Sequence, residues 1–174
     1  MKNVLCIIFC FMFILACRAE VIQAGITIEQ VPKKLFGSWR ISGKLEQTNA
    51  PYAFRPQSID FWNLTRLGNI IELDNPMSGA NSEIQVDAVE GNVIVFTRKV
   101  DYDKNKTLTD TVRIRLNNDT FTGVNTLKLE TFSLIDGHLI KTQNATYHIR
   151  GEKIAGESIV EEKTPMGSLD DTSF

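Results

Sequence analysis

Beyond the first 36 residues, apolar and polar positions alternate along the chain in short runs that are separated by turn-forming residues. Within residues 37–47, the alternate positions on one side hold apolar residues or glycine: Trp39, Ile41, Gly43 and Leu45. The positions between them are polar or charged. A period of two is typical of a strand that buries one face and exposes the other. We therefore predict that the first strand begins at Gly37.

Similar runs recur up to about residue 155, and the connections between them are rich in Gly, Asn and Asp. The Asp-Gly pair at 136–137 is the strongest signal for a tight hairpin. Counting the runs gives about eight strands, and residues 37–154 contain no sustained helical period. A short helical turn fits near Thr27, where Pro32 limits its length. The pattern predicts an all-β fold: an antiparallel up-and-down β-barrel of about eight strands, with a two-sheet sandwich as the alternative.

The N-terminus has a different composition. A short cationic start, "MKN", precedes the apolar run "VLCIIFCFMFILA" and the small residues that follow it. This arrangement is typical of a secretory signal peptide over residues 1–19, because the apolar run is short for a membrane span. "ILAC" also resembles the bacterial lipobox, which implies cleavage before Cys17 and lipidation of that cysteine. The other cleavage site follows Ala19. We expect an exported protein: a periplasmic or cell-surface lipoprotein held by this anchor, or a secreted protein.

All three cysteines, Cys6, Cys10 and Cys17, lie in that segment, so the folded domain contains no disulfide and no thiolate. We divide the rest of the chain into a lead-in at 20–36, the barrel at 37–155 and a disordered acidic tail at 156–174. At 174 residues with 43% hydrophobic residues, a single domain can build its core from apolar packing alone.

The Gly37-x-Trp39 opening after a short helical turn resembles the first motif of the lipocalin and calycin barrels. Arg150, in the final run "TYHIRG", resembles the basic residue of that family's last strand. The resemblance implies that Trp39 closes one end of the barrel while Arg150 packs across its indole in a cation–π contact. It also implies a ligand inside the barrel, toward the opposite end and near the loop "TNAPYAFRPQ".

We therefore expect a small hydrophobic or amphipathic ligand, or a lipid, bound by burial of its apolar surface. The candidate wall consists of residues that we expect to point inward: Ile41, Leu45, Phe61, Phe96, Ile114, Phe121 and Leu127. The alternative is a non-catalytic lipoprotein whose barrel is solidly packed and whose outer face or loops serve as a structural or interaction module.

Other chemistry is weakly supported. A net charge of −2 without a basic run argues against a nucleic-acid partner. "DYDKNKTLTDTV" departs from a calcium-binding loop and is interpreted as a hairpin turn, and two histidines without cysteine give no zinc spacing. We expect no metal, no cofactor and no enzymatic activity, and the oligomeric state stays open. Four sequons would allow glycosylation in a eukaryotic host, at Asn63, Asn105, Asn118 and Asn144. A lipobox, in contrast, is a bacterial signal.

Overall fold

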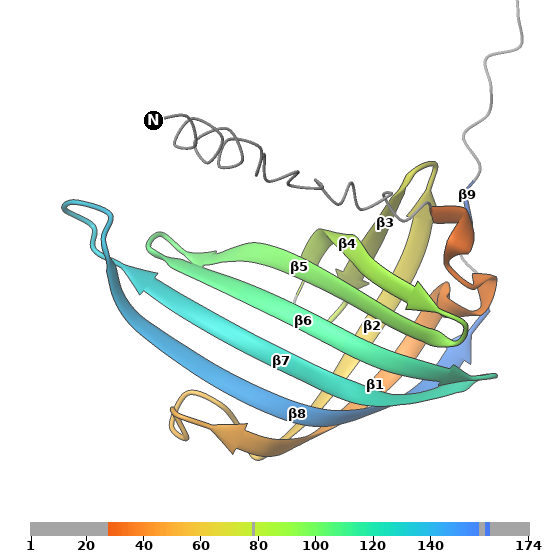
Figure 1. Cartoon of the computed structure of the whole chain (residues 1–174), viewed down its shortest axis with the longest axis horizontal. Coiled ribbons are helices and arrows are strands. Elements are labelled where there is room, and N and C mark those ends of the chain that lie inside the picture. The colour runs from red at the N-terminus through yellow and green to blue at the C-terminus, as the bar shows by residue number, and fades with distance from the viewer. Residues whose placement is uncertain (1–27, 78, 157–158, 161–174) are drawn as a thin grey trace, which may run out of the picture.

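The computed structural model describes residues 28–77, 79–156 and 159–160. Within these residues, eight antiparallel strands close into an up-and-down barrel in which each strand pairs with the next one and β8 returns to β1 (Figure 1). This confirms the predicted fold class. The strands are β1 Gly37–Thr48, β2 Gln57–Leu67, β3 Ile70–Asn75, β4 Ala80–Glu90, β5 Val93–Asp103, β6 Lys106–Asn117, β7 Thr120–Phe132 and β8 Leu139–Ala155.

Two 3₁₀ turns, η2 (Ile28–Gln30) and η3 (Lys33–Leu35), precede the barrel. Pro32 caps the second turn with the fixed φ that proline imposes, and it separates the two turns. None of the helical turns in the described part of the chain is long or apolar enough to cross a membrane. Leu35, at the end of η3, is fully buried and covers the end of the barrel where β1 begins.

Large aromatic side chains fill this end of the barrel, which we call the Trp39 end. The indole Nε1 of Trp39 donates to the Leu35 carbonyl at 2.8 Å, and its ring lies 5.1 Å from that of Phe121. Phe121 stacks on Trp62 with 6.0 Å between the ring centroids, and Trp62 meets Phe96 edge-on at 6.1 Å. These four rings are almost completely buried and form the centre of the hydrophobic core.

Gly151 on β8 makes room for this aromatic packing. A Cβ at this position would lie 2.2 Å from the Phe121 ring, which is far inside van der Waals contact. The pairing register places Gly151 directly opposite Phe121 on β7. A larger residue at position 151 would therefore displace Phe121 and the rings that pack on it.

The cation that covers Trp39 is Lys153, and the assignment of this role to Arg150 is wrong. Lys153 Nζ lies 5.3 Å from the indole centroid and donates to the Lys34 carbonyl at 3.0 Å. The reason is the strand phase: Tyr147 and Gly151 point inward on β8, so Lys153 continues the inner face, whereas Arg150 points outward. Arg150 is exposed, with its Nε 3.9 Å from Glu152.

Four strands continue beyond the rest of the barrel at the other end, which we call the distal end. β4 pairs with β5 only up to Gln85 and Thr97, and β1 pairs with β8 only as far as Thr48 and Ala145. β5, β6, β7 and β8 remain paired with one another past these points, as the long green-to-blue strands of Figure 1 show. This four-stranded extension forms one wall of the distal end.

The predicted tail contains one paired segment. Ile159–Val160 form β9, which lies parallel to β2 at Arg66 and Leu67. These two residues therefore pair through their backbone with β2, and the expected disorder of the tail stays a prediction. The predicted signal peptide, Cys17 and residues 161–174 lie outside the described residues.

Replacing Lys153 with Met should lower the free energy of unfolding by about 1–2 kcal/mol, because the cation–π contact and the bond to Lys34 are lost while the aliphatic stem is kept. Arg150→Met is the matched control and should change the free energy of unfolding by less than about 0.5 kcal/mol, since Arg150 is exposed. Urea denaturation of both variants gives the comparison. Equal losses, or a larger loss for Arg150→Met, would contradict the assignment.

Candidate ligand-binding site in the barrel interior

The inner faces of β5 to β8 can be followed as rows of directly paired residues, because the register between these strands is continuous. From the Trp39 end toward the distal end, the rows are Leu116, Phe121 and Gly151; Ile94, Ile114, Gly123 and Ile149; Phe96, Val112, Asn125 and Tyr147; Arg98, Asp110, Leu127 and Ala145; and Val100, Leu108, Leu129 and Gln143. The first two rows are apolar, and polar side chains begin at the third.

Arg98 and Asp110 form an ion pair inside the barrel, directly opposite each other on β5 and β6. Arg98 Nε donates to Asp110 Oδ2 at 2.9 Å, and the two side chains are only 12% and 3% exposed. A buried pair of charges is costly to remove from water and rarely serves stability alone. Its position at the boundary of the solid core therefore points to a further role.

Several polar atoms around this pair are buried without a hydrogen-bond partner among the described residues. They are Arg98 Nη1, Asp110 Oδ1 and Asn125 Oδ1, and a further buried atom of this kind is Ser82 Oγ on β4, opposite Leu73 of β3. We call Arg98, Asp110 and Asn125 the polar cluster, since they lie on three adjacent strands and Asn125 is the diagonal neighbour of Asp110. A buried donor or acceptor left unpaired costs about 1–3 kcal/mol, so a group that pairs with these atoms gains free energy.

The electrostatics of the cluster are dominated by burial. Burial raises the pKa of the Asp110 carboxyl above its ordinary value, and the charge of Asp60 raises it further. The Arg98 guanidinium and the Asn125 side chain lower the pKa of Asp110, but burial outweighs them. Asp60 comes from β2 and is itself held in place by the indole Nε1 of Trp62 at 3.1 Å and by the Asn75 amide.

Beyond the polar cluster, the inner face is mostly apolar again but only half-buried. Leu127 lies in the same row as Asp110, and Leu129, Leu108 and Val100 form the next row outward together with Gln143. Because residues two apart on a strand share a face, these side chains and the polar cluster line the same surface. The distal interior thus combines a buried polar centre with a partly solvated apolar wall.

The loop at 49–56, between β1 and β2, folds over this end. Phe54 is buried in the core cluster, and the Tyr147 hydroxyl donates to the Arg55 carbonyl at 2.9 Å. Asn49 is bonded to Asn144 on β8 through its side chain and its backbone. The loop that we expected beside the ligand therefore packs one aromatic side chain into the interior.

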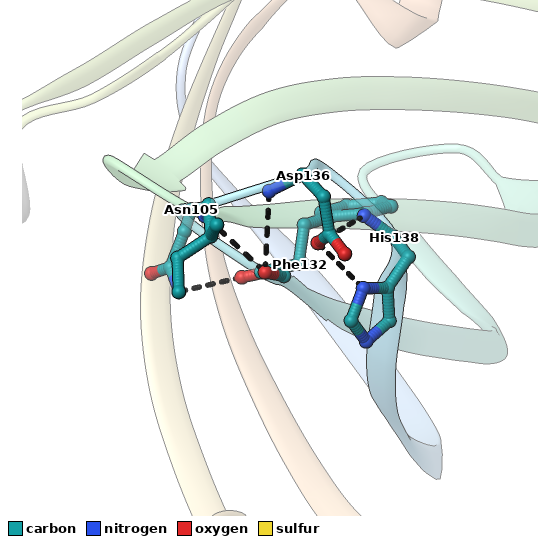
Figure 2. Close-up of polar contacts among 6 residues, drawn as sticks. Asn105, Phe132, Asp136 and His138 are labelled. Atoms are coloured by element: carbon teal, nitrogen blue, oxygen red, sulfur yellow. Dashed lines mark hydrogen bonds and ion pairs between the residues drawn. The ribbon is translucent and has the colours of Figure 1, made fainter.

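The rim of the four-stranded extension holds an open cleft of about 750 Å³ between the β5–β6 hairpin and the β7–β8 loop. Figure 2 shows how this loop is held: the Asn105 amide donates to the Phe132 carbonyl at 2.8 Å, and the His138 ring contacts Asp136. This bonding leaves Leu134 and Ile135 exposed, at 75% and 97%. Exposed apolar side chains on an ordered loop are typical of a contact surface.

The structure separates the predicted wall residues into three groups. Ile41, Phe96, Ile114 and Phe121 belong to the packed core and are at most 3% exposed, while Leu45 and Leu127 are half-buried against it. Phe61 lies on the outer face, and its inward assignment is wrong because Trp62 and Leu64 occupy the inner face of β2. Of the predicted wall residues on β5 to β8, Leu127 adjoins the polar cluster.

The four sequons occupy different surroundings. The Asn63 side chain accepts from the Ser38 hydroxyl at 3.2 Å, and Asn105 is tied into the loop contact described above. Asn118 is exposed in the β6–β7 turn with φ +51°, and Asn144 is exposed on β8. Within the described residues, no group of three or more His, Cys, Asp or Glu side chains is arranged to hold a metal ion.

Sequence reasoning missed the polar cluster. The available signal was phase: Arg98 follows Phe96 by two positions and Asp110 precedes Val112 by two, so each stands where its strand has inward-facing apolar residues. A charged residue at such a position on each of two consecutive strands predicts an internal ion pair.

Comparison with known proteins does not place the chain in a family. No family model matches it, and no curated protein matches it significantly. One solved structure, described as "Structure of EF1p2_mFAP2b bound to DFHBI", is similar at 9% identity and a TM-score of 0.31, over 70% of this chain and 95% of that chain. A similarity at this level leaves function to be argued from the chain's own residues.

Asp110 should make stability depend on pH in a defined direction. Its folded-state pKa is raised above the ordinary 3.8, so its contribution is fully present at low pH and is lost as pH rises through the folded-state pKa. The free energy of unfolding of the wild type should therefore rise relative to that of Asp110→Asn as pH falls from 7 toward 4. Denaturant titrations at several pH values measure this difference.

The control for that experiment is Asp119→Asn, at the exposed β6–β7 turn. This variant should keep the wild-type pH profile. Parallel profiles for the wild type and Asp110→Asn would show that Asp110 does not take up a proton in this range.

Proposed function

We propose that this protein is an exported, non-catalytic binding protein that holds a small hydrophobic or amphipathic molecule in the distal half of its barrel. The observation that carries the proposal is the polar cluster, whose buried atoms lack partners where the solid core gives way to a half-buried apolar wall. Small-molecule sites commonly combine apolar walls with a few convergent polar groups. An eight-stranded barrel is also large enough for one small ligand when side chains leave room.

The Trp39 end cannot hold the ligand without loss of core packing, because its aromatic rings are in contact and almost fully buried. The unpaired atoms of the polar cluster are also covered by neighbouring side chains. Binding would therefore displace half-buried residues such as Leu127 and Leu129, and burial of the ligand's apolar surface would offset the cost of that movement.

The proposal is tested by titrating the protein with N-phenyl-1-naphthylamine, a dye whose fluorescence rises in apolar surroundings. Leu129→Gln replaces an inner-face apolar side chain with a polar one of similar size and should weaken binding about 5- to 30-fold, since about 1–2 kcal/mol of apolar burial is lost. Thr126→Gln, on the outer face of the same strand, should bind as the wild type does. Absence of dye binding to the wild type would contradict the proposal.

Export and anchoring rest on the N-terminal sequence. The cationic start, the apolar run and the cysteine of "ILAC" support cleavage and membrane attachment through Cys17. Cleavage after Ala19 would instead release the barrel as a secreted protein. The two outcomes differ in the mature N-terminal residue and in its modification.

Cys17→Ser should move the protein from the membrane fraction to the soluble fraction when it is expressed in a bacterial host, because the site of lipidation is lost. Cys10→Ser, in the middle of the apolar run, is the matched control and should leave the distribution unchanged. If both variants fractionate as the wild type does, the anchor is not at Cys17.

A second candidate function is an interaction module, and the exposed side chains at the distal rim favour it. Leu134 and Ile135 in the β7–β8 loop and Tyr102 near the end of β5 are 66–97% exposed. A protein that works through this rim would tolerate Leu129→Gln and lose partner binding with Leu134→Ser and Ile135→Ser. The dye titration and the rim variants therefore distinguish the two functions.

A further inference from the structure

The hydrogen-bonding capacity of the polar cluster is specific. Arg98 Nη1 is a donor, whereas Asp110 Oδ1 and Asn125 Oδ1 are acceptors. The Asn125 side chain acts on Asp110, but these three atoms have no partner at hydrogen-bond distance in the described part of the chain. A carboxylate can only accept hydrogen bonds, so it would pair with Arg98 and leave both acceptors unpaired. A primary amide donates two bonds and accepts at its carbonyl, so it complements all three atoms, and a hydroxyl donates one bond and accepts, so it complements two of them.

The charges around the cluster disfavour an anion as well. The guanidinium of Arg98 is already paired with Asp110 at 2.9 Å, so it carries little charge that is not balanced. Asp60, on the inner face of β2, acts on Asp110 through its negative charge and therefore lies within electrostatic range of the site. A ligand anion would face two carboxyl groups and one guanidinium in surroundings that screen charge poorly.

Apolar side chains fix the direction in which a ligand would lie. Leu127 adjoins Asp110 in the same row, and Leu129 and Val100 lie one row nearer the distal end. An amphipathic molecule with its polar group at the cluster would extend its apolar part along these side chains toward the rim. In the opposite direction, Phe96 and Val112 close the path, since both are buried in the core.

From these observations we infer that the ligand of the proposed site carries an uncharged, hydrogen-bond-donating polar group, such as an amide or alcohol, that binds Arg98, Asp110 and Asn125. Ligands headed by a carboxylate or sulfonate are selected against. This inference rests on the proposed function and narrows it to a chemical class. Specificity arises because each mismatched ligand leaves buried polar atoms unpaired.

The test uses three probes that share a ten-carbon chain: decanamide, 1-decanol and decanesulfonate. Each competes with N-phenyl-1-naphthylamine for the wild-type protein at pH 7.5. Decanamide and 1-decanol should displace the dye at concentrations at least tenfold lower than decanesulfonate does. Equal or stronger displacement by decanesulfonate would overturn the inference.

Two variants test the residues. In Asp110→Asn the charge of Arg98 is no longer balanced, so the affinity for decanesulfonate should rise at least tenfold. The preference for decanamide and 1-decanol over decanesulfonate should therefore narrow or reverse. In Asn125→Leu one acceptor is lost at similar volume, so decanamide should bind about 5- to 10-fold more weakly while decanesulfonate is unchanged. Asn144→Leu makes the same change on the outer face of β8 and should alter the affinity for neither decanamide nor decanesulfonate.

The outcomes separate the inference from the proposed function. If the dye binds but the three probes compete equally, the site exists and the polar cluster does not select the ligand, so the inference is wrong. If the dye does not bind the wild type, the proposed function and the inference are both wrong. Should Asp110→Asn not fold, Asn125→Leu decides the matter: unchanged selectivity in that variant would overturn the inference.

Discussion

The packing of Trp39 against Phe121, and of Phe121 against Trp62, determines how the interior of this barrel is used. An eight-stranded barrel has room for its own side chains and little more. The aromatic rings occupy the Trp39 end, Leu35 and Lys153 cover it, and Gly151 is required so that Phe121 fits. Since this end is filled, any space for a ligand must come from the distal half.

The distal half is built on different principles. There β5 to β8 extend past the other strands, so their inner faces have fewer partners and remain half-buried. At the boundary, the Arg98–Asp110 pair and Asn125 introduce buried polar atoms that the described residues leave unpaired. Replacing such a pair with apolar residues is often neutral or stabilising, so its presence is better explained by recognition than by stability. The proposed amide or alcohol ligand supplies the missing hydrogen bonds.

Alternation along the chain predicted the strands and the all-β class, while the pairing of β8 with β1 decides for the barrel over the two-sheet sandwich. The first strand and the up-and-down topology follow from a period of two and from tight turns, which are local properties, whereas the closing role of Trp39 was implied by the resemblance to the lipocalin and calycin barrels. The assignment of the closing cation failed because Arg150 was chosen by resemblance, although Tyr147, Gly151 and Lys153 share the inner phase. Phe61 was misassigned because aromatic residues stand at both 61 and 62, and only the pairing of Trp62 with Trp39 resolves the phase.

The site was harder to predict than the fold because it depends on non-local pairing. Arg98 and Asp110 are twelve positions apart, and nothing in either strand alone shows that they meet. Burial of the atoms around them is likewise a property of the closed barrel. A rule that inspects charged residues at inward phase on consecutive strands would have found the ion pair, but the unpaired atoms become visible only in three dimensions.

In the proposed function, one half of the barrel is solid core and the other half takes the ligand. Methyl resonances measured with and without saturating decanamide test it directly, because Ile94 and Ile114 report on the core while Val100, Leu127 and Leu129 report on the distal wall. We expect large shifts for the second group and negligible shifts for the first. Shifts confined to Leu134 and Ile135 at the rim, or centred on Ile94 and Ile114, would contradict it.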